Sequence, residues 1–356
     1  MRDVLRRLIP SLAEGRELVV CQVVETKGST PQKAGALMVV DPDGGQFGTL
    51  GGGCVENEVR MKAGARLGRA EASVDSFILD HDYAWADGLI CGGKMVILSE
   101  AVQGPAALSY YQTALKLVDQ GDGFTEAISV DPAQTGIARL GARVLFDHAG
   151  VLIALFGTDR AGEALMHLVQ PIDDRPHSAV RSGFALLPTL PRIRLVIVGA
   201  GHVGQAVGEL AARADFDVQV VDDRAQYANL ERFPKAGKIL VGPFEEVLPT
   251  LELDARTYAL IVTRGHGHDE EALLHLAPTQ AAYVGLIGSK RKIRLIFESL
   301  REQGVDAEAL DRVAAPVGLD IGSQTVFEIA VSIVGELIAR RNLGNTARRT
   351  VAGVSM

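Results

Sequence analysis

The sequence lacks several features that would assign a protein to a class at once. It has no uninterrupted run of about 18 apolar residues, so no membrane-spanning helix is expected. It has no basic tract and its net charge is -8, which argues against nucleic acid as the main partner, because neutralising phosphates requires clustered Lys and Arg. The three cysteines, Cys21, Cys54 and Cys91, form no disulfide pattern. The expected compartment is therefore the cytoplasm.

The remaining composition is that of an ordinary globular protein. Hydrophobic residues make up 47% and charged residues 22% of the 356 residues, a length that suits two domains. The first eight residues have no long apolar core and no small-residue cleavage site, so they are interpreted as part of an amphipathic helix rather than a signal peptide. No internal repeat is visible.

Proline and glycine positions divide the chain into segments. Pro188 and Pro191 interrupt any regular element and mark the expected domain boundary. We expect an N-terminal domain over residues 1–104, a middle segment over 105–190 that belongs with it, a C-terminal domain over 191–344 and a flexible tail over 345–356. The N-terminal domain is expected to be α/β or α+β. The C-terminal half alternates strand and helix, which predicts an α/β, Rossmann-like, doubly wound parallel sheet.

The C-terminal domain begins with a dinucleotide-type motif. An apolar strand at residues 195–198 leads into a G-x-G-x-x-G turn, a helix with an apolar stripe, and a second strand at 218–221 that ends in acid. Asp222 lies roughly 20 residues past the glycines, where such folds place a ribose ligand. A phosphate-bearing ligand could dock at the start of this helix. The candidate contacts in this unit are Gly199, Gly201, His202, Gly204, Asp222 and Arg224.

Two further loops follow strands of the same predicted sheet. One contains Thr263, Arg264 and His266, and the other contains Ser289 and Lys290 at the start of a helix. Ligands bind at the carboxyl edge of open α/β sheets, so we expect these side chains to contribute to one binding site. For the first loop, metal ligation by its His residues and Asp269, and helix capping by Asp269, stay open as alternatives.

The N-terminal domain has its own candidate site. Gly51, Gly52 and Gly53 precede Cys54 at a loop-to-helix junction, where a helix N-terminus favours the thiolate. Three glycines allow a large ligand to approach the backbone closely. Cys54 could coordinate a soft metal centre or carry a persulfide, and Glu56 could act as an acid/base or as a hydrogen-bond acceptor. A structural glycine turn beside a buried cysteine is the plainer alternative.

Two other N-terminal loops carry candidate residues. Cys91 precedes a glycine pair and could converge with Cys54 on one site, although the two make no zinc motif. Ser29 and Thr30 lie in a loop after a strand and could hold an anion or polar ligand, with a capped turn as the alternative. Cys21 lies inside an apolar strand, where core packing is expected.

Together these motifs resemble the xanthine dehydrogenase accessory protein family, also called XdhC/CoxI. The resemblance covers most of the chain. It is carried by residues 28–31, 51–56, 91–93, 199–204, 222–224, 263–269, 288–290 and 316–322. The chain departs from the family pattern at Val326, where Thr-Pro is expected at the start of the last helix.

The resemblance implies a maturation factor rather than a xanthine oxidoreductase. Such a protein would bind molybdenum cofactor (molybdopterin), support its sulfuration and insert it into a molybdenum hydroxylase apoprotein. Its expected partners are that apoprotein, a cysteine desulfurase-type sulfur donor and a second copy of the chain, with the apolar last helix as a dimer surface. Two alternatives stay open: an NAD(P)-dependent oxidoreductase that binds a nucleotide at the Rossmann site, and a sulfurtransferase that uses Cys54.

Overall fold

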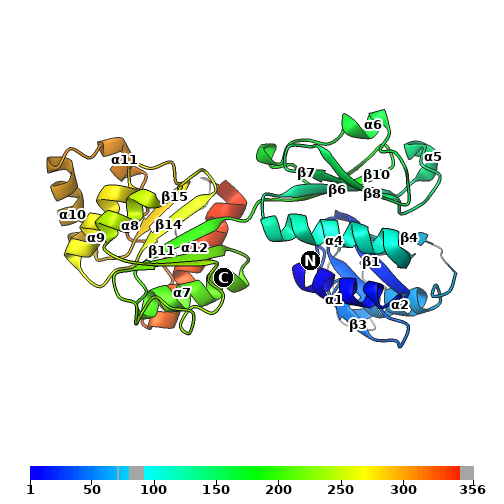
Figure 1. Ribbon diagram of the computed structural model, residues 1–356, viewed down its shortest axis with the longest axis horizontal. Coiled ribbons are helices and arrows are strands. Elements are labelled where there is room, and N and C mark those ends of the chain that lie inside the picture. The colour runs from blue at the N-terminus through cyan, green and yellow to red at the C-terminus, as the bar shows by residue number, and fades with distance from the viewer. Residues whose placement is uncertain (70–71, 80–91, 345–356) are drawn as a thin grey trace. The chain divides into compact units, whose positions relative to one another are not determined.

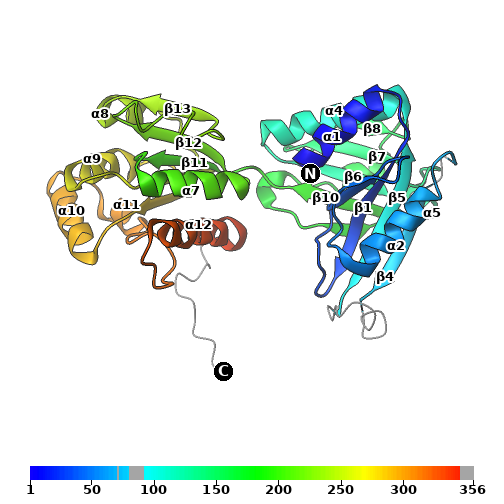
Figure 2. The same ribbon diagram turned by 90° about the horizontal axis from the view of Figure 1, so that it is seen from below.

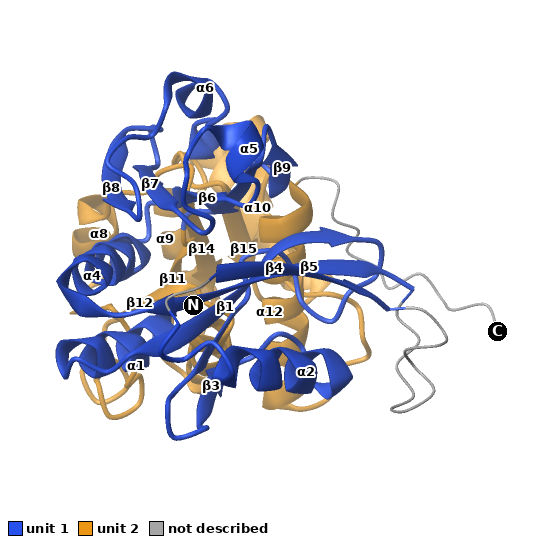
Figure 3. Cartoon of the chain, turned by 90° about the vertical axis from the view of Figure 1, so that its right-hand side faces the viewer, with its two compact units in different colours: residues 1–191 blue, residues 192–356 orange. Residues whose placement is uncertain are grey.

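The chain divides into two compact units. The structure, a computed structural model, describes residues 1–69, 72–79 and 92–344, so the predicted flexible tail at 345–356 lies outside the described residues (Figure 1). Unit 1 spans Met1–Pro191 and unit 2 spans Arg192–Met356 (Figure 3). In the described ranges, none of the helices combines the length and hydropathy needed to cross a bilayer.

Unit 1 is built on two five-stranded antiparallel sheets, so it is α+β, the second of the two expected classes. The strand orders are β3-β2-β1-β5-β4 in the first sheet and β8-β7-β6-β10-β9 in the second sheet. The elements are α1 (Arg2–Ala13), β1 (Leu18–Lys27), β2 (Leu37–Val40), β3 (Gln46–Gly48), α2 (Gly53–Gly64), β4 (Ala72–Ile78), β5 (Lys94–Val102), α4 (Gly104–Gln120), β6 (Phe124–Ser129), α5 (Pro132–Thr135), β7 (Arg143–Asp147), β8 (Leu152–Phe156), α6 (Glu163–Met166), η1 (Ile172–Asp174), β9 (Ala179–Arg181) and β10 (Phe184–Thr189).

Strand β1 reads as a continuous apolar run because both of its faces are covered. On one face Val19, Cys21 and Val23 pack in the same cluster as Val55 and Val59 of α2. On the other face β1 meets helices α1 and α4, which lie side by side, and further along it meets the second sheet (Figure 1). Burial on both faces removes the polar alternation that a half-exposed strand would show.

The two sheets of unit 1 also share a buried ionic cluster. Arg143 of β7 is fully buried and its guanidinium contacts Glu100 of β5 at 3.2 Å and Glu126 of β6 at 2.9 Å. Gln22 of β1 accepts from Arg143 at 2.6 Å and donates to Glu126 at 2.8 Å. Tyr110 of α4 donates to Glu126 at 2.8 Å. Because these groups come from both sheets, the cluster fixes how the first sheet packs on the second.

Unit 2 is the predicted Rossmann-like fold. Its five strands are all parallel in the order β13-β12-β11-β14-β15, with the reversal of strand order between β11 and β14. Helices α7 and α12 pack on one face and α8, α9 and α10 on the other (Figure 2). The elements are β11 (Arg194–Val198), α7 (His202–Arg213), β12 (Asp217–Asp222), β13 (Lys238–Val241), α8 (Phe244–Val247), η2 (Leu248–Thr250), β14 (Thr257–Ile261), α9 (His266–Leu276), β15 (Tyr283–Leu286), α10 (Lys290–Glu302), α11 (Ala307–Asp311) and α12 (Val326–Leu343).

Helix α12 begins without the expected proline but with a full capping box. The Thr325 hydroxyl accepts from the Glu328 N–H at 3.2 Å, and the Glu328 carboxylate accepts from the Thr325 N–H at 3.0 Å. Two backbone N–H groups at the helix start therefore have side-chain acceptors. The apolar stripe of α12 packs mostly inside unit 2, where Ala330, Ile333 and Leu337 are buried against the sheet.

Candidate functional site

Three consecutive glycines at the start of α2 take conformations that other residues avoid. Gly51, Gly52 and Gly53 have φ of 114°, 76° and 70°. A Cβ on Gly51 would also lie 2.5 Å from the Cβ of Pro31. The run of glycines is therefore required by the backbone itself, because only glycine takes this region without strain. Cys54 follows in the first turn of α2 and is half-buried.

The three glycine loops of unit 1 lie together. Besides the approach of Gly51 to Pro31, a Cβ on Gly93 would lie 2.1 Å from the carbonyl oxygen of Ser29. The structure thus brings residues 28–31 and 92–93 beside the amino end of α2. Ser29 is exposed, and the Thr30 hydroxyl donates to the Gln32 carbonyl at 2.8 Å, which is the capped turn given as the alternative. Cys91 lies outside the described residues.

Glu56 braces the glycine loop. Its carboxylate accepts from the Leu50 N–H at 2.8 Å, the Gly52 N–H at 3.0 Å, the Thr49 hydroxyl at 2.6 Å and the Gln46 amide at 2.5 Å. Partial burial raises the pKa of Glu56, but these hydrogen bonds outweigh burial and hold the pKa below its usual value. A carboxylate held ionised by four donors suits the hydrogen-bond acceptor role better than the acid/base role.

Cys21, unlike the half-buried Cys54, is a core thiol. It is fully buried in β1, where the Ser99 hydroxyl lies 3.5 Å from its sulfur. Burial raises the pKa of Cys21 to about 11, so it stays a neutral thiol at physiological pH. Core packing is its role in this structure.

The glycine turn of unit 2 has the tight geometry of its motif. Gly199 has φ of 112°, and a Cβ there would lie 2.5 Å from the Val262 carbonyl oxygen. A Cβ on Gly204 would lie 2.0 Å from the Gly199 carbonyl oxygen, so α7 packs directly against the turn. Gly201 precedes α7 and has nothing near its Cβ position, and His202 is exposed in the first turn. The turn leaves room for a ligand over Gly201 and His202.

The carboxylate of Asp222 is hydrogen-bonded to other groups of the protein. Asp222 is 1% exposed, and its carboxylate accepts from the Ala200 N–H at 2.7 Å and from Arg224 through the backbone N–H, Nε and Nη2 at 2.8–3.0 Å. Burial raises the pKa of Asp222, but the Arg224 side chain and the two backbone N–H groups outweigh it and lower the pKa. In this arrangement Asp222 fixes the glycine turn, and little of its acceptor capacity is left for a ribose diol.

The loop after β14 is tied to both of its neighbours. Arg264 donates to Asp223 at the end of β12 at 2.8 Å, across the reversal of strand order. Asp269 is fully buried, accepts from the Thr263 hydroxyl at 2.5 Å and forms an ion pair with Lys292 of α10. Asp269 therefore joins the loops after β14 and β15. The capping alternative required a side-chain hydrogen bond from Asp269 to the start of α9, and α9 has no side-chain cap.

The His residues of this loop are solvated. The His266 side chain is 50% exposed and lies 3.7 Å from Glu270 on its own helix. His268 contacts Glu271 and Arg264 at 3.5 and 3.3 Å. Across the described residues, no group of three or more His, Cys, Asp and Glu side chains is arranged to hold a metal ion.

A cavity of about 520 Å³ opens beside the loop after β15. Its walls are mostly apolar, with Ile287, Leu319 and Ile329 among them, and exposed Lys290 lies on its lining. Size and lining are those of a small-molecule site. Ser289 next to it caps α10 by accepting from the Lys292 N–H at 3.3 Å. The opposite wall is the loop at 316–323, which the sequence singled out only through the family motif and not as a site.

The fold and these sites define a class: a two-unit protein with a thiol beside a glycine cradle in one unit and a Rossmann-like ligand edge in the other. The family model described as the XdhC and CoxI family matches residues 11–77, and the model described as the XdhC Rossmann domain matches residues 195–337. The chain belongs to the XdhC and CoxI family.

Several relatives are similar to this chain. A Bacillus subtilis protein, named as part of a probable xanthine dehydrogenase, is 25% identical over 93% of this chain and 95% of its own length. The molybdenum cofactor insertion chaperone PaoD of Escherichia coli is 22% identical over 96% of this chain and 88% of its own. The uncharacterized Escherichia coli protein YqeB is 38% identical over 42% of this chain, and that match spans 28% of YqeB.

A solved structure has the same fold. It is described as a xanthine dehydrogenase from Bacillus halodurans and covers 96% of this chain and 97% of its own, with a TM-score of 0.77 and 23% identity. At this identity the likeness supports the fold, both units included, and leaves the activity to be argued from the site.

Proposed function

We propose that this protein binds molybdenum cofactor and inserts it into the apoprotein of a molybdenum hydroxylase of the xanthine dehydrogenase type. Family membership and the names of two relatives, an insertion chaperone and a probable xanthine dehydrogenase component, support this role. The structural observation that carries it is the half-buried thiol of Cys54 directly after three glycines at positive φ.

The residues of unit 1 fit the metal end of the cofactor. When bound, the cofactor supplies a molybdenum–dithiolene centre, which is soft and favours sulfur ligands. Cys54 would provide such a ligand, and Gly52, which has nothing within 4 Å of its Cβ position, leaves the backbone open to a bulky group. Glu56 would keep the loop in this shape through its four hydrogen bonds.

The residues of unit 2 fit the pterin and phosphate end. The cavity beside β15 has apolar walls for a flat ring, and Lys290 would pair with the phosphate. The Gly201–His202 start of α7 offers backbone N–H groups at the same sheet edge.

Sulfuration and assembly complete the proposal. A cysteine desulfurase-type partner would provide the sulfur for sulfuration. The step of this chain would be persulfide exchange, in which Cys54 takes the outer sulfur and the donor cysteine leaves as a thiol. We also propose a homodimer in the cytoplasm. On α12, Phe327 is 58% exposed and Val331 is 43% exposed, so these two residues, rather than the buried stripe, would form the contact.

The NAD(P)-dependent alternative has less support in the geometry. The acid at the ribose position, Asp222, is buried and bonded to Ala200 and Arg224. We therefore expect no hydride transfer with NADH or NADPH. Calorimetric titration of the purified protein with either nucleotide tests the alternative, since a site whose acid is already hydrogen-bonded should bind neither tightly.

The function is tested by purifying the protein from a host that makes the cofactor. We expect bound pterin by fluorescence after oxidation, and transfer of cofactor activity to a hydroxylase apoprotein. A Lys290→Gln variant should retain less pterin, whereas Lys235→Gln, at a lysine outside the lining of this cavity, should retain as much as the unmodified protein. Equal retention in both variants would remove Lys290 from the proposed site.

A further inference from the structure

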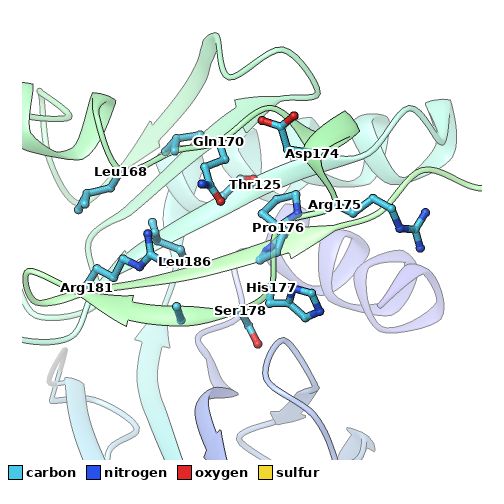
Figure 4. A pocket seen from close by; sticks show the side chains of 13 residues that line it. Thr125, Leu168, Gln170, Asp174, Arg175, Pro176, His177, Ser178, Arg181 and Leu186 are labelled. Carbon is cyan, nitrogen blue, oxygen red and sulfur yellow. The ribbon is translucent and has the colours of Figure 1, made fainter. Parts of the chain in front are cut away.

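A second cavity lies in unit 1, on the outer face of its second sheet. It has a volume of about 300 Å³, at the lower end of the range for small-molecule sites. The segment at 168–178, which includes η1, lines the cavity together with residues of β6, β10 and the edge strand β9. Figure 4 shows Arg181 and Leu186 on one side of the cavity, His177 and Arg175 on the other, and Thr125 with Gln170 between them. None of these residues belongs to the sites proposed for the cofactor.

The floor of this cavity carries an unsatisfied hydroxyl. Thr125 of β6 is 3% exposed, and its Oγ1 atom is buried without a hydrogen-bond partner in the part of the chain that the structure describes. Thr257 of unit 2 shows the usual situation: it is 0% exposed and donates to Asp254 at 2.8 Å. Since a buried hydroxyl without a partner is costly, a molecule in the cavity is the natural source of its hydrogen bond.

The rim of the cavity is rich in donors and carries positive charge. In Figure 4 the Arg181 side chain lies toward the cavity, whereas Arg175 and Asp174 point away from it, and His177, Ser178 and Gln170 add polar groups. Arg175 also has φ of 49°, a left-handed conformation that is uncommon for a large side chain. The walls between floor and rim are apolar and consist of Leu168, Val169, Leu186 and Pro188. A ligand must therefore combine an apolar body with an anionic group.

We propose that this cavity binds a small amphipathic anion, a carboxylate or phosphate monoester on a compact apolar body. Arg181 pairs with the anionic group, and the apolar body lies against Leu186 and Pro188. The Thr125 hydroxyl, buried next to the cavity, turns toward the ligand to form the one deep hydrogen bond. The site is separate from the proposed cofactor site and does not depend on it.

The test measures binding of phenyl phosphate and phenylacetate to the full chain by calorimetry, with neutral phenylacetamide as the matched probe. We expect saturable binding of at least one anion and none of the amide. Which anion binds more tightly distinguishes a phosphate ligand from a carboxylate ligand. Arg181→Gln should weaken binding about tenfold or more, because it removes a charge-assisted hydrogen bond.

Two threonine variants separate the ligand site from a merely structural role. Thr125→Val should weaken binding about threefold to tenfold while the melting temperature stays equal or rises, since an unpaired hydroxyl is removed. Thr257→Val should lower the melting temperature and leave binding unchanged. The proposal is overturned if neither anion binds, in which case the cavity holds water only, or if Arg181→Gln and Thr125→Val bind as the unmodified protein does.

Discussion

The carboxylate of Asp222 accepts the backbone N–H of Ala200 at 2.7 Å, so the end of β12 is fastened to the glycine turn that follows β11. Arg224 holds the same carboxylate from the other side at 2.8 and 3.0 Å. The acid that a dinucleotide fold uses for its ligand serves here to shape the ligand site. The contribution of Asp222 can be measured as a change in the free energy of unfolding.

Asp222→Asn should destabilise unit 2 by about 1–3 kcal/mol, since it weakens hydrogen bonds made by a buried charge. The pKa of Asp222 is lowered in the folded state, so its contribution is present above the ordinary value of 3.8 and is lost as the pH falls toward the folded pKa. Denaturant unfolding at pH 7 and at pH values below 3.8 measures both effects. Asp311→Asn, on an exposed side chain, is the control and should change stability by less than about 0.5 kcal/mol.

Glu56→Ala should cost roughly 1–3 kcal/mol and loosen the glycine loop, because the donors of Thr49, Leu50 and Gly52 lose their shared acceptor. The pKa of Glu56 is lowered in the folded state, as that of Asp222 is. The stabilisation that Glu56 provides is therefore lost as the pH falls through the folded pKa. Unfolding and the alkylation rate of Cys54 report the change. Glu58→Ala, which removes an exposed pair with Lys62, should leave both readings nearly unchanged. Identical behaviour of the two variants would contradict the bracing role.

Two neighbouring glycines provide a matched test of the loop geometry. Gly51→Ala and Gly52→Ala both place a side chain at positive φ, which costs about 1–2 kcal/mol. Only at Gly51 does the new Cβ also collide with Pro31, at 2.5 Å, whereas nothing lies within 4 Å at Gly52. Gly51→Ala should therefore be the more destabilising by thermal unfolding. Equal costs would show that the contact with Pro31 is not part of the folded loop.

The sequence predicts the local features of unit 2 well, because each depends on neighbours in the chain. The strand at 195–198, the glycine turn and α7 follow one another, and their patterns give the Rossmann-like fold directly. What the sequence does not predict is which groups a buried acid meets. Asp222 could be placed at a sheet edge from its spacing, but its bond to Ala200 depends on how the turn folds back.

Unit 1 shows the same limit more strongly. Arg143 stands in a strand whose pattern looks ordinary, and its burial depends on the packing of one sheet on another. The loop at 316–323 and the cavity over β6 are likewise made by residues without periodicity, far apart in sequence from the residues that they face. Tertiary contacts of this kind leave no local signal in the sequence.

Arg143→Leu should destabilise the protein by about 3–5 kcal/mol, because it leaves the Glu100 and Glu126 carboxylates buried without their common partner. Arg213→Leu, which removes an exposed pair with Glu209, should cost less than about 0.5 kcal/mol. Chemical unfolding of both variants provides the comparison. A small loss for Arg143→Leu would mean that the cluster is hydrated and not the joint between the sheets.

Binding of the metal end of the cofactor by Cys54 is tested by the molybdenum content of Cys54→Ser protein purified from a cofactor-producing host. Molybdenum per chain should fall by about tenfold or more relative to the unmodified protein, while Cys21→Ser should change it little. Unchanged molybdenum in the Cys54→Ser protein would show that Cys54 does not bind the metal.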